Sequence, residues 1–247
     1  MESTRFPPLP PRAALRWSVV RRTVAGLRPG TILELGCGQG AMGSRLATMA
    51  TYTAVEPDDD SFAAAEARIT THGGTVIHGD HNKAPSGTGY DLVCAFEVLE
   101  HIADDAAALE EWLPLVRPGG QLLLSVPADP SRFSRWDELV GHYRRYTADG
   151  LRERLTGAGA TDTQIVHYGW PLGYLLDVVR DRLAARHAGK VAESAEERTQ
   201  ASGRIYQPRG GLAGAIIQAG IAPFALAQRL QPGRGDGLVA VATRPAA

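Results

Sequence analysis

A glycine-rich turn directly after a short apolar strand constrains the fold of this chain more than any other feature. Residues 31–35 are mostly apolar and follow Pro29 and Gly30, which predicts a buried parallel strand. Gly36, Gly38 and Gly40 come next, and alternate glycines allow positive φ angles and a close approach of a ligand to the backbone. Residues 41–49 then have helical spacing. A strand, a glycine turn and a helix in this order predict a doubly wound α/β sheet that binds a nucleotide-like ligand at the turn.

The carboxylate of Glu34 helps to choose between two classes of ligand that bind at such turns. Gly36, Gly38 and Ala41 fit the spacing of a dinucleotide fingerprint, which leaves an NAD(P)-dependent oxidoreductase as an alternative. A carboxylate two residues before the first glycine repels a pyrophosphate but attracts a ligand that carries an amino group and a sulfonium. The turn therefore favours a sulfonium cofactor.

The charge balance gives no electrostatic reason to expect a nucleic-acid partner. The 247 residues include 26 basic and 27 acidic side chains, so the formal net charge is −1. Cys37 and Cys94 lack the spacing of a metal site and fit a reducing compartment. The N-terminal residues lack the apolar core of a signal peptide, so we expect a cytoplasmic protein with one main domain.

Two acidic residues end predicted strands where a nucleotide would need them. Residues 52–56 form an apolar strand that ends in Glu56, 20 positions after Gly36, and Pro57 follows. Doubly wound folds place a carboxylate at this distance to accept hydrogen bonds from ribose hydroxyls. Residues 75–80 form the next strand, and its last residue, Asp80, can accept a hydrogen bond from the exocyclic amine of an adenine.

The remaining apolar runs predict a seven-stranded sheet with a helical insertion near its end. Further strands are expected at 90–96, 121–126, 163–168 and 237–243, and helices at 12–27, 105–116 and 151–155. Residues 170–236 separate the last two strands and are too many for a hairpin, so they predict a helical cap. The expected organisation is an N-terminal arm and helix (1–30), a cofactor-binding core (31–169), the cap (170–236) and a final strand with a tail (237–247).

Residues 212–230 within the cap are apolar enough to require a membrane check. They contain Gln218, Pro223 and Gln228, and their apolar side chains are mostly small, so a packed helix kinked or restarted at Pro223 is favoured over a transmembrane segment. Peripheral membrane contact through this segment and a homodimer formed by the cap both stay open. The polar residues 190–203 are predicted to be mobile.

Several motifs together resemble those of class I S-adenosylmethionine (SAM)-dependent methyltransferases. They are Glu34 with the three glycines, Glu56, Gly79-Asp80, Asp91, the Glu-Val-Leu-Glu-His run at 97–101 and the Arg-Pro-Gly-Gly run at 117–120. The run at 97–101 is similar to that of the ubiquinone- and menaquinone-biosynthesis methyltransferases. This resemblance implies a Rossmann-like, mostly parallel sheet with an antiparallel last strand. It also implies methyl transfer to an O, N or C nucleophile of a small-molecule acceptor, in secondary-metabolite, quinone or lipid-like biosynthesis. A non-catalytic SAM-binding protein is the other alternative.

The resemblance also implies which residues contact the cofactor. The glycine turn would hold the methionine moiety, Glu56 the ribose and Asp80 the adenine amine, with Phe96 and Glu97 opposite the turn. The full expected set is Glu34, Gly36, Cys37, Gly38, Gly40, Glu56, Pro57, Asp80, His81, Phe96 and Glu97.

Two histidines are the candidate catalytic residues. Methyl transfer from a sulfonium is an in-line displacement, so a base is needed only if the acceptor must lose a proton. His101 ends the fourth-strand loop, where it could instead tie the loop to the backbone, and His142 follows the fifth strand. The segment after His142 is expected to contact the acceptor through Tyr143, Arg144, Arg145 and Tyr146.

Two further alternatives concern charged residues near these histidines. Arg144 and Arg145 could instead pair with Asp177 or Asp181 of the cap. No metal ion is predicted, because His78, His81, Asp104 and Asp105 lack the spacing of a metal site.

Overall fold

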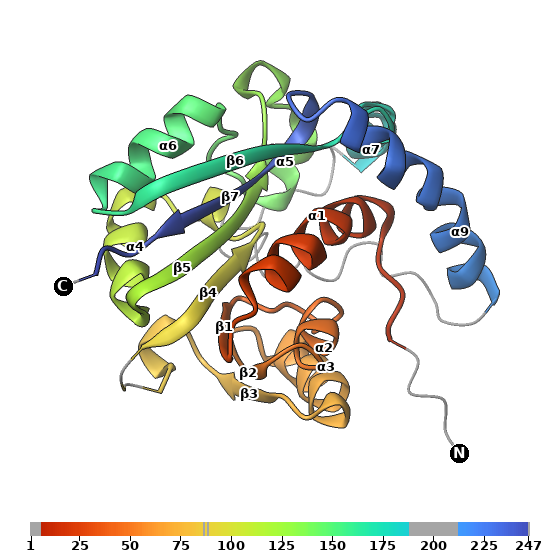
Figure 1. Ribbon diagram of the computed structural model, residues 1–247. Helices are drawn as coiled ribbons and strands as arrows, with labels where there is room; N and C mark the ends of the chain where they lie inside the picture. Colours follow the sequence, from red (N-terminus) through yellow and green to blue (C-terminus); the bar gives the residue numbers. More distant parts are fainter. Residues whose placement is uncertain (1–5, 86, 88, 188–211, 247) are drawn as a thin grey trace.

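A seven-stranded mixed sheet forms the centre of the protein (Figure 1). The computed structural model describes residues 6–85, 87, 89–187 and 212–246. The strand order is β3-β2-β1-β4-β5-β7-β6, and β7 is antiparallel to both of its neighbours while the other pairs are parallel. The strands are β1 (Thr31–Leu35), β2 (Thr51–Glu56), β3 (Thr75–His78), β4 (Tyr90–Phe96), β5 (Val116–Pro127), β6 (Thr161–Gly169) and β7 (Gly235–Thr243). The expected mostly parallel sheet with an antiparallel last strand is confirmed.

Helices cover both faces of the sheet and give it two apolar cores. One core joins the sheet to α1 (Pro11–Leu27), α2 (Gly43–Leu46), α3 (Asp59–Ile69) and part of α9 (Leu212–Ala227). The other joins it to α4 (Asp105–Trp112) and α6 (Ala148–Gly157). The central strands β1 and β4 are buried on both sides, which explains their nearly continuous apolar sequences.

Side-chain hydrogen bonds cap the N-termini of three helices. Asp58 caps α3 by accepting from the Ser61 amide at 2.9 Å, and Thr147 caps α6 by accepting from the Gly150 amide at 3.0 Å. Asp104 does the same for α4. These caps fix where each helix begins relative to the strand before it.

The predicted helical insertion between the last two strands is confirmed. It contains α7 (Leu172–His187), which packs against α5 (Arg135–Val140), and α9, which packs against α1. Helix α9 continues through Pro223 without interruption. Residues 190–203, predicted to be mobile, lie outside the described residues. Among the residues that the structure describes, no helix is both long and apolar enough to span a bilayer.

Three elements differ from the sequence-based expectation in length. The helix after the glycine turn is confined to α2, residues 43–46. Strand β5 begins at Val116 and includes the Arg-Pro-Gly-Gly run, which lies before the strand expected at 121–126. This segment is extended because Gly119 donates to the Arg244 carbonyl at 2.9 Å and Arg244 donates to the Gly120 carbonyl at 3.0 Å. Strand β6 begins earlier, at Thr161, where it pairs with the end of β7.

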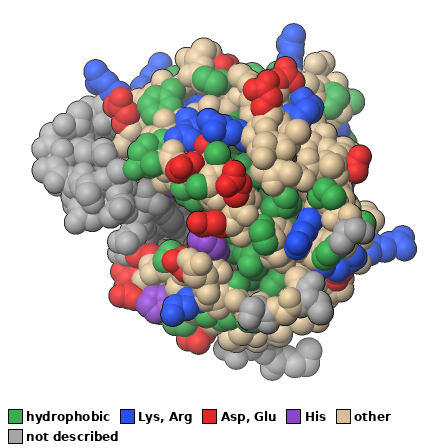
Figure 2. All heavy atoms as spheres, turned by 90° about the vertical axis from the view of Figure 1, so that its left-hand side faces the viewer, with side chains coloured by type: hydrophobic (Ala, Val, Ile, Leu, Met, Phe, Trp, Pro, Cys, Tyr) green, Lys and Arg blue, Asp and Glu red, His purple; other side chains and the backbone are tan. Residues whose placement is uncertain are grey.

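Basic and acidic side chains alternate on the face that carries α4 and α6 (Figure 2). This face shows no broad basic patch of the kind that tracks a phosphate backbone. The strand order reverses between the neighbouring strands β1 and β4, since β2 and β3 lie on one side of β1 and the later strands lie on the other side, beyond β4. Such a switch point is where doubly wound folds bind ligands.

Candidate active site

Two adjoining cavities lie at the carboxyl ends of the central strands. The first has a volume of about 380 Å³ and the second about 310 Å³. Gly36, Pro57 and Val98 line both, so the cavities meet beside the glycine turn. A ligand with two parts can therefore occupy both cavities across this junction.

The glycine turn has the expected left-handed backbone. The φ angles of Gly36, Gly38 and Gly40 are 69°, 53° and 76°. Their surroundings differ, however. A Cβ atom on Gly40 would lie 2.9 Å from the Cα atom of Ala65, whereas a Cβ atom on Gly38 would meet no atom within 4 Å. Gly40 is therefore needed for packing against α3 and lines neither cavity, while Gly38 leaves room for a ligand.

Glu56 ends β2 with its carboxylate beside the glycine turn. One oxygen, Oε2, accepts a hydrogen bond from the Gly38 amide at 2.7 Å, and Oε1 accepts from the Asp58 amide at 3.1 Å. The residue is 6% exposed and lines the first cavity. Burial raises the pKa of this carboxyl, and the two amides partly oppose the rise. The expected position of Glu56 at the cofactor site agrees with this geometry.

Glu34 lies deeper, on β1, and its carboxyl is held by another side chain. It is 2% exposed and accepts a hydrogen bond from the Tyr52 hydroxyl. Burial raises the pKa of Glu34 to about 7, despite the opposing effects of Tyr52 and Arg16. Glu34 still lines the first cavity, so a cationic ligand there would encounter a carboxyl that ionises near neutral pH.

The second cavity is an apolar slot with acidic groups at its edge. Leu35, Val55, Val98 and Ile102 line it together with Asp80. The Asp80 Oδ1 atom accepts from the Asn82 amide at 3.0 Å, which leaves its other oxygen available.

His81 also lines the second cavity, beside the expected adenine position. Its Nε2 atom lies 2.8 Å from Glu111 Oε2. This ion pair fixes the imidazole at the rim of the cavity.

Phe96 and Glu97 face the first cavity from the end of β4, as expected. Glu97 has a φ of 57° and its Oε1 atom accepts from the Ser125 and Tyr168 hydroxyls, each at 3.1 Å. The same oxygen lies 3.3 Å from Arg16 Nη1. Burial alone would raise the pKa of Glu97, but the nearby guanidinium groups, foremost Arg16, hold it below its ordinary value.

The two candidate catalytic histidines meet at the opposite wall of the first cavity. Their rings lie edge to face with centroids 4.6 Å apart, and both line the cavity. His142 Nδ1 is 2.8 Å from Asp137 Oδ1, and His142 Nε2 is 3.8 Å from Glu100 Oε1. Burial, with the neighbouring His142, lowers the pKa of His101 to about 3, so this imidazole is neutral. Glu100 is fully buried, and burial followed by the charge of Glu97 raises its pKa well above the ordinary value.

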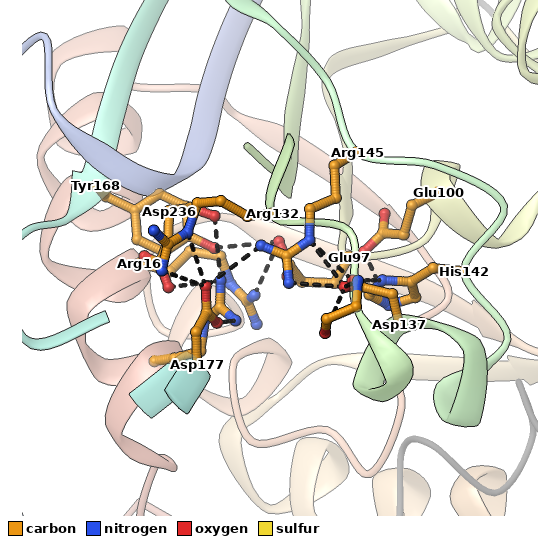
Figure 3. Close-up of polar contacts among 12 residues, drawn as sticks. Arg16, Glu97, Glu100, Arg132, Asp137, His142, Arg145, Tyr168, Asp177 and Asp236 are labelled. Carbon is orange, nitrogen blue, oxygen red and sulfur yellow. Dashed lines mark hydrogen bonds and ion pairs between the residues drawn. The ribbon is translucent and has the colours of Figure 1, made fainter. Parts of the chain in front are cut away.

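A buried ionic network connects His142 to the cap (Figure 3). Asp137 binds Arg145 through both oxygens at 2.8–3.0 Å, and Arg145 Nη1 lies 3.3 Å from Asp177 Oδ2 on α7. Asp177 also binds Arg12 of α1 at 2.9 Å. The side chain that orients His142 is thus itself held by the cap and, through the cap, by the N-terminal helix.

The four residues expected to contact the acceptor line neither cavity, and the side chains of Arg144, Arg145 and Tyr146 have other partners. Tyr143 is 48% exposed, and Tyr146 is buried with its hydroxyl donating to Asp105 Oδ2 at 2.9 Å. Arg144 pairs with Asp105 at 2.7 Å. Pairing with the cap, the alternative drawn from the sequence, is found for Arg145 with Asp177 and is not found for Arg144.

Several cavity-lining residues were not anticipated. They are Arg12, Arg16, Trp136, Asp137 and Arg180. Arg12 and Arg16 are four residues apart on the apolar face of α1, a spacing that could have indicated a buried role. Nothing in the sequence around Asp137 or Arg180 indicated that the α5 and α7 segments would bring them to this cavity.

Comparison with known proteins places these features in one family. Residues 12–165 match a family described as a methyltransferase domain. A probable S-adenosylmethionine-dependent methyltransferase of Mycolicibacterium smegmatis is 30% identical over 69% of this chain and 65% of its own length. The chain thus spans slightly less than two thirds of that relative. A ubiquinone biosynthesis O-methyltransferase of Nitrosomonas europaea is 27% identical over 50% of this chain and 54% of its own length.

The fold is also found among solved structures. That of the N-methyltransferase NodS from Bradyrhizobium japonicum, in complex with S-adenosyl-L-homocysteine (SAH), has a TM-score of 0.54. The match has 16% identity and covers 92% of this chain and 84% of that one. At this identity the likeness concerns the fold alone.

Proposed function

This chain belongs to the SAM-dependent methyltransferase family, and on that premise we propose that it methylates an oxygen nucleophile of a small-molecule acceptor. The observation that carries the proposal is the pair of joined cavities, with Glu56 beside their junction and two histidines at the far wall of the larger one. SAM is the cofactor of the family. An acceptor in the first cavity would be enclosed by protein and kept from bulk water.

We expect the cofactor to lie across the junction, with its adenine in the second cavity and its methionine moiety in the first. Its adenine would occupy the apolar slot, with the exocyclic amine donating to Asp80. The ribose hydroxyls would donate to the remaining lone pairs of Glu56, whose two oxygens already accept from the Gly38 and Asp58 amides. The methionine moiety would lie against Gly36 and Cys37 in the first cavity.

Three side chains suit the charged ends of that methionine moiety. Arg16 lines the first cavity from α1 and provides a guanidinium for the carboxylate. Its existing partner Glu97 and the neighbouring Glu34 provide carboxyl groups on the side where an ammonium and a sulfonium would lie. The cavity thus offers groups of both signs to a zwitterionic ligand.

The acceptor is expected to approach from the side of His101 and His142. Methyl transfer requires the nucleophile, the methyl carbon and the sulfur to lie in line, so the protein mainly positions the two reactants. As the oxygen–carbon bond forms, the carbon–sulfur bond breaks and its electron pair neutralises the sulfonium. A hydroxyl acceptor must also lose its proton, and His101 and His142 are imidazoles that line this wall of the first cavity.

The central experiment measures cofactor binding and turnover separately. Calorimetric titration with SAH should give saturable binding, and titration with NAD should give none, which would distinguish the family activity from the oxidoreductase alternative. Turnover is followed as SAH formation, by mass, against panels of phenols, alcohols, amines and acidic metabolites. His142→Ala should lower turnover or acceptor affinity while leaving the SAH affinity nearly unchanged.

A matched control and two contrary outcomes complete this design. His78→Ala removes an exposed histidine that lies beside Asp59 and outside both cavities, and it should behave as the parent. Absence of SAH binding would refute the cofactor assignment. Normal turnover by His142→Ala would refute the acceptor position.

A further inference from the structure

We propose that Arg180 of α7 binds an anionic group of the acceptor, a carboxylate or a phosphate, so that the acceptor is an acidic small molecule. Arg180 lines the first cavity from the cap, together with Trp136 and Val140 of α5. The role given to Arg180 in choosing the acceptor rests on the proposed methyl transfer. The anion site itself rests on the contacts of Arg180, and its binding can be measured without turnover.

Arg180 differs from the other arginines that line the first cavity in having no acidic partner. Arg12 and Arg16, which line the cavity from α1, pair with Asp177 and Glu97 at 2.9 and 3.3 Å. Within the described part of the chain, no carboxylate lies within ion-pair distance of Arg180, whose closest described contact is with an aromatic ring. A guanidinium is always charged, and charged groups withdrawn from water are normally paired. An anionic ligand in the cavity would supply the missing partner.

Trp136 holds Arg180 in position without neutralising its charge. The guanidinium carbon lies over the Trp136 ring, 5.2 Å from its centroid, which is within the range of a cation–π interaction. Stacking of this kind leaves the N–H groups at the edge of the guanidinium plane able to bind a carboxylate or phosphate through two hydrogen bonds. Burial, followed by the charge of Arg12, lowers the pKa of Arg180 to about 10. Arg180 is therefore still charged at neutral pH, and a bound anion would offset the cost of withdrawing it from water.

Helix α7 turns a charged side toward the cavity. Asp177 of this helix is buried and binds three arginines from other elements (Figure 3), which are Arg12, Arg132 and Arg145. Arg180 comes three residues after Asp177 and so lies on the same side of the helix. Other residues of α7 are apolar and exposed, namely Leu175, Val178 and Val179. Burial of apolar surface therefore does not explain how α7 is oriented, whereas the ion pairs of Asp177 do, and they direct Arg180 into the cavity.

Arg180 lies on the acceptor side of the first cavity. Trp136 and His142 belong to one segment, α5 and the residues directly after it, so the stacked guanidinium shares a wall with His142. Arg16 stays available for the carboxylate of SAM. An acceptor whose anionic end binds Arg180 would place its neutral body against Val140 and its hydroxyl on the side of His142. The charge of Arg180 would then select acids over neutral molecules of the same shape.

The test measures the binding of small anions by the full-length protein, with and without saturating SAH. The probes are benzoate, phenyl phosphate and benzamide, which is a neutral analogue of benzoate. Calorimetric titration should show one saturable site for benzoate or phenyl phosphate, and the tighter of the two identifies the anionic group. Benzamide should bind at least about 10-fold more weakly. Arg180→Gln should weaken anion binding about 10- to 100-fold while leaving the affinities for benzamide and SAH nearly unchanged.

Two further variants make the test specific to Arg180. Arg182→Gln is the matched control, because it removes an exposed arginine of α7 that lines neither cavity, and it should bind every probe as the parent does. Arg180→Lys keeps the charge but loses the planar fork, so it should retain only part of the anion affinity. In turnover assays with hydroxy acids and their amides, the parent should show a higher kcat/KM for the acids, and Arg180→Gln should lose this preference.

Four results would overturn the inference. They are the absence of saturable anion binding, benzamide binding as tight as that of both anions, parent-like anion binding by Arg180→Gln, and an equal loss in Arg182→Gln. Loss of SAH affinity alone in Arg180→Gln would also overturn it and assign Arg180 to the cofactor. Anion binding that depends on Arg180 in a protein without SAH binding would support the anion site and refute the proposed methyl transfer. Methyl transfer to neutral acceptors alone would refute the role of Arg180 and leave the proposed function standing.

Discussion

Replacing Glu34 by glutamine should stabilise the ligand-free protein at alkaline pH and leave it nearly unchanged in acid. Burial raises the pKa of Glu34 from 4.5 to about 7, so the folded state prefers the neutral carboxyl. Below the unfolded pKa both states are protonated and the group costs nothing. Between pH 4.5 and pH 7 the Glu34 carboxyl ionises in the unfolded chain but stays largely protonated in the folded chain. The free energy of unfolding of the parent therefore falls as the pH rises through this range.

The size of this effect follows from the shift. Each pKa unit corresponds to about 1.4 kcal/mol, so the full cost above pH 7 is about 3 kcal/mol. Glutamine has nearly the same shape, carries no charge and can still accept the hydrogen bond from Tyr52. The free energy of unfolding of Glu34→Gln should therefore exceed that of the parent by about 3 kcal/mol near pH 8, and by less than about 1 kcal/mol near pH 5.

Urea denaturation at both pH values, without cofactor, measures this difference directly. Taking the variant minus the parent cancels the pH dependence of the other groups. Glu66→Gln, at an exposed position on α3, serves as the control and should change little at either pH. A difference for Glu34→Gln that is the same at both pH values, or that is larger in acid, would refute the reasoning.

Four further substitutions test separate parts of the site. Glu56→Ala should weaken SAH binding about 30- to 150-fold in calorimetry, since charge-assisted hydrogen bonds to the ribose contribute about 2–3 kcal/mol; unchanged affinity would refute the ribose assignment. Gly38→Val should keep the circular dichroism of the parent but lose SAH binding, because the valine side chain would enter the cavity. Gly40→Ala should instead lower the melting temperature, because its Cβ atom would collide with α3. Tyr146→Phe should lower the free energy of unfolding by about 1–3 kcal/mol, because the hydrogen bond to Asp105 is lost. SAH affinity and turnover should be retained, and a turnover defect in the folded variant would indicate that Tyr146 contacts the acceptor.

The cofactor half of the site was predictable because its residues are local in sequence. The turn at Gly36 and Gly38 and the acids Glu56 and Asp80 each follow a strand directly. Parallel strands bring their carboxyl ends to one edge of the sheet, so the position along each strand is enough to place these groups together. The antiparallel last strand followed from the resemblance to one family rather than from periodicity.

The acceptor half was predicted less well because tertiary contacts decide it. His142 reaches the cavity, but Tyr146, four residues later, points into the opposite core and binds Asp105. A loop has no fixed periodicity from which side-chain directions can be read. The partners of Arg145 lie on α5 and α7, and no local pattern could reveal that Asp137 and Asp177 converge on one guanidinium.

The position of β7 has a consequence for how the chain folds during synthesis. This strand is synthesised after the other six strands of the sheet, yet it lies inside the sheet and supplies partners to both β5 and β6. Until it is made, both of those strands have an unpaired edge, which is the kind of surface that pairs with other chains. Asp236, at the start of β7, also binds Arg12 at 2.8 Å, near the opposite end of the chain. A nascent chain that ends before residue 235 therefore has neither the completed sheet nor the ion pair to α1, and we expect it to depend on chaperones until β7 has been synthesised.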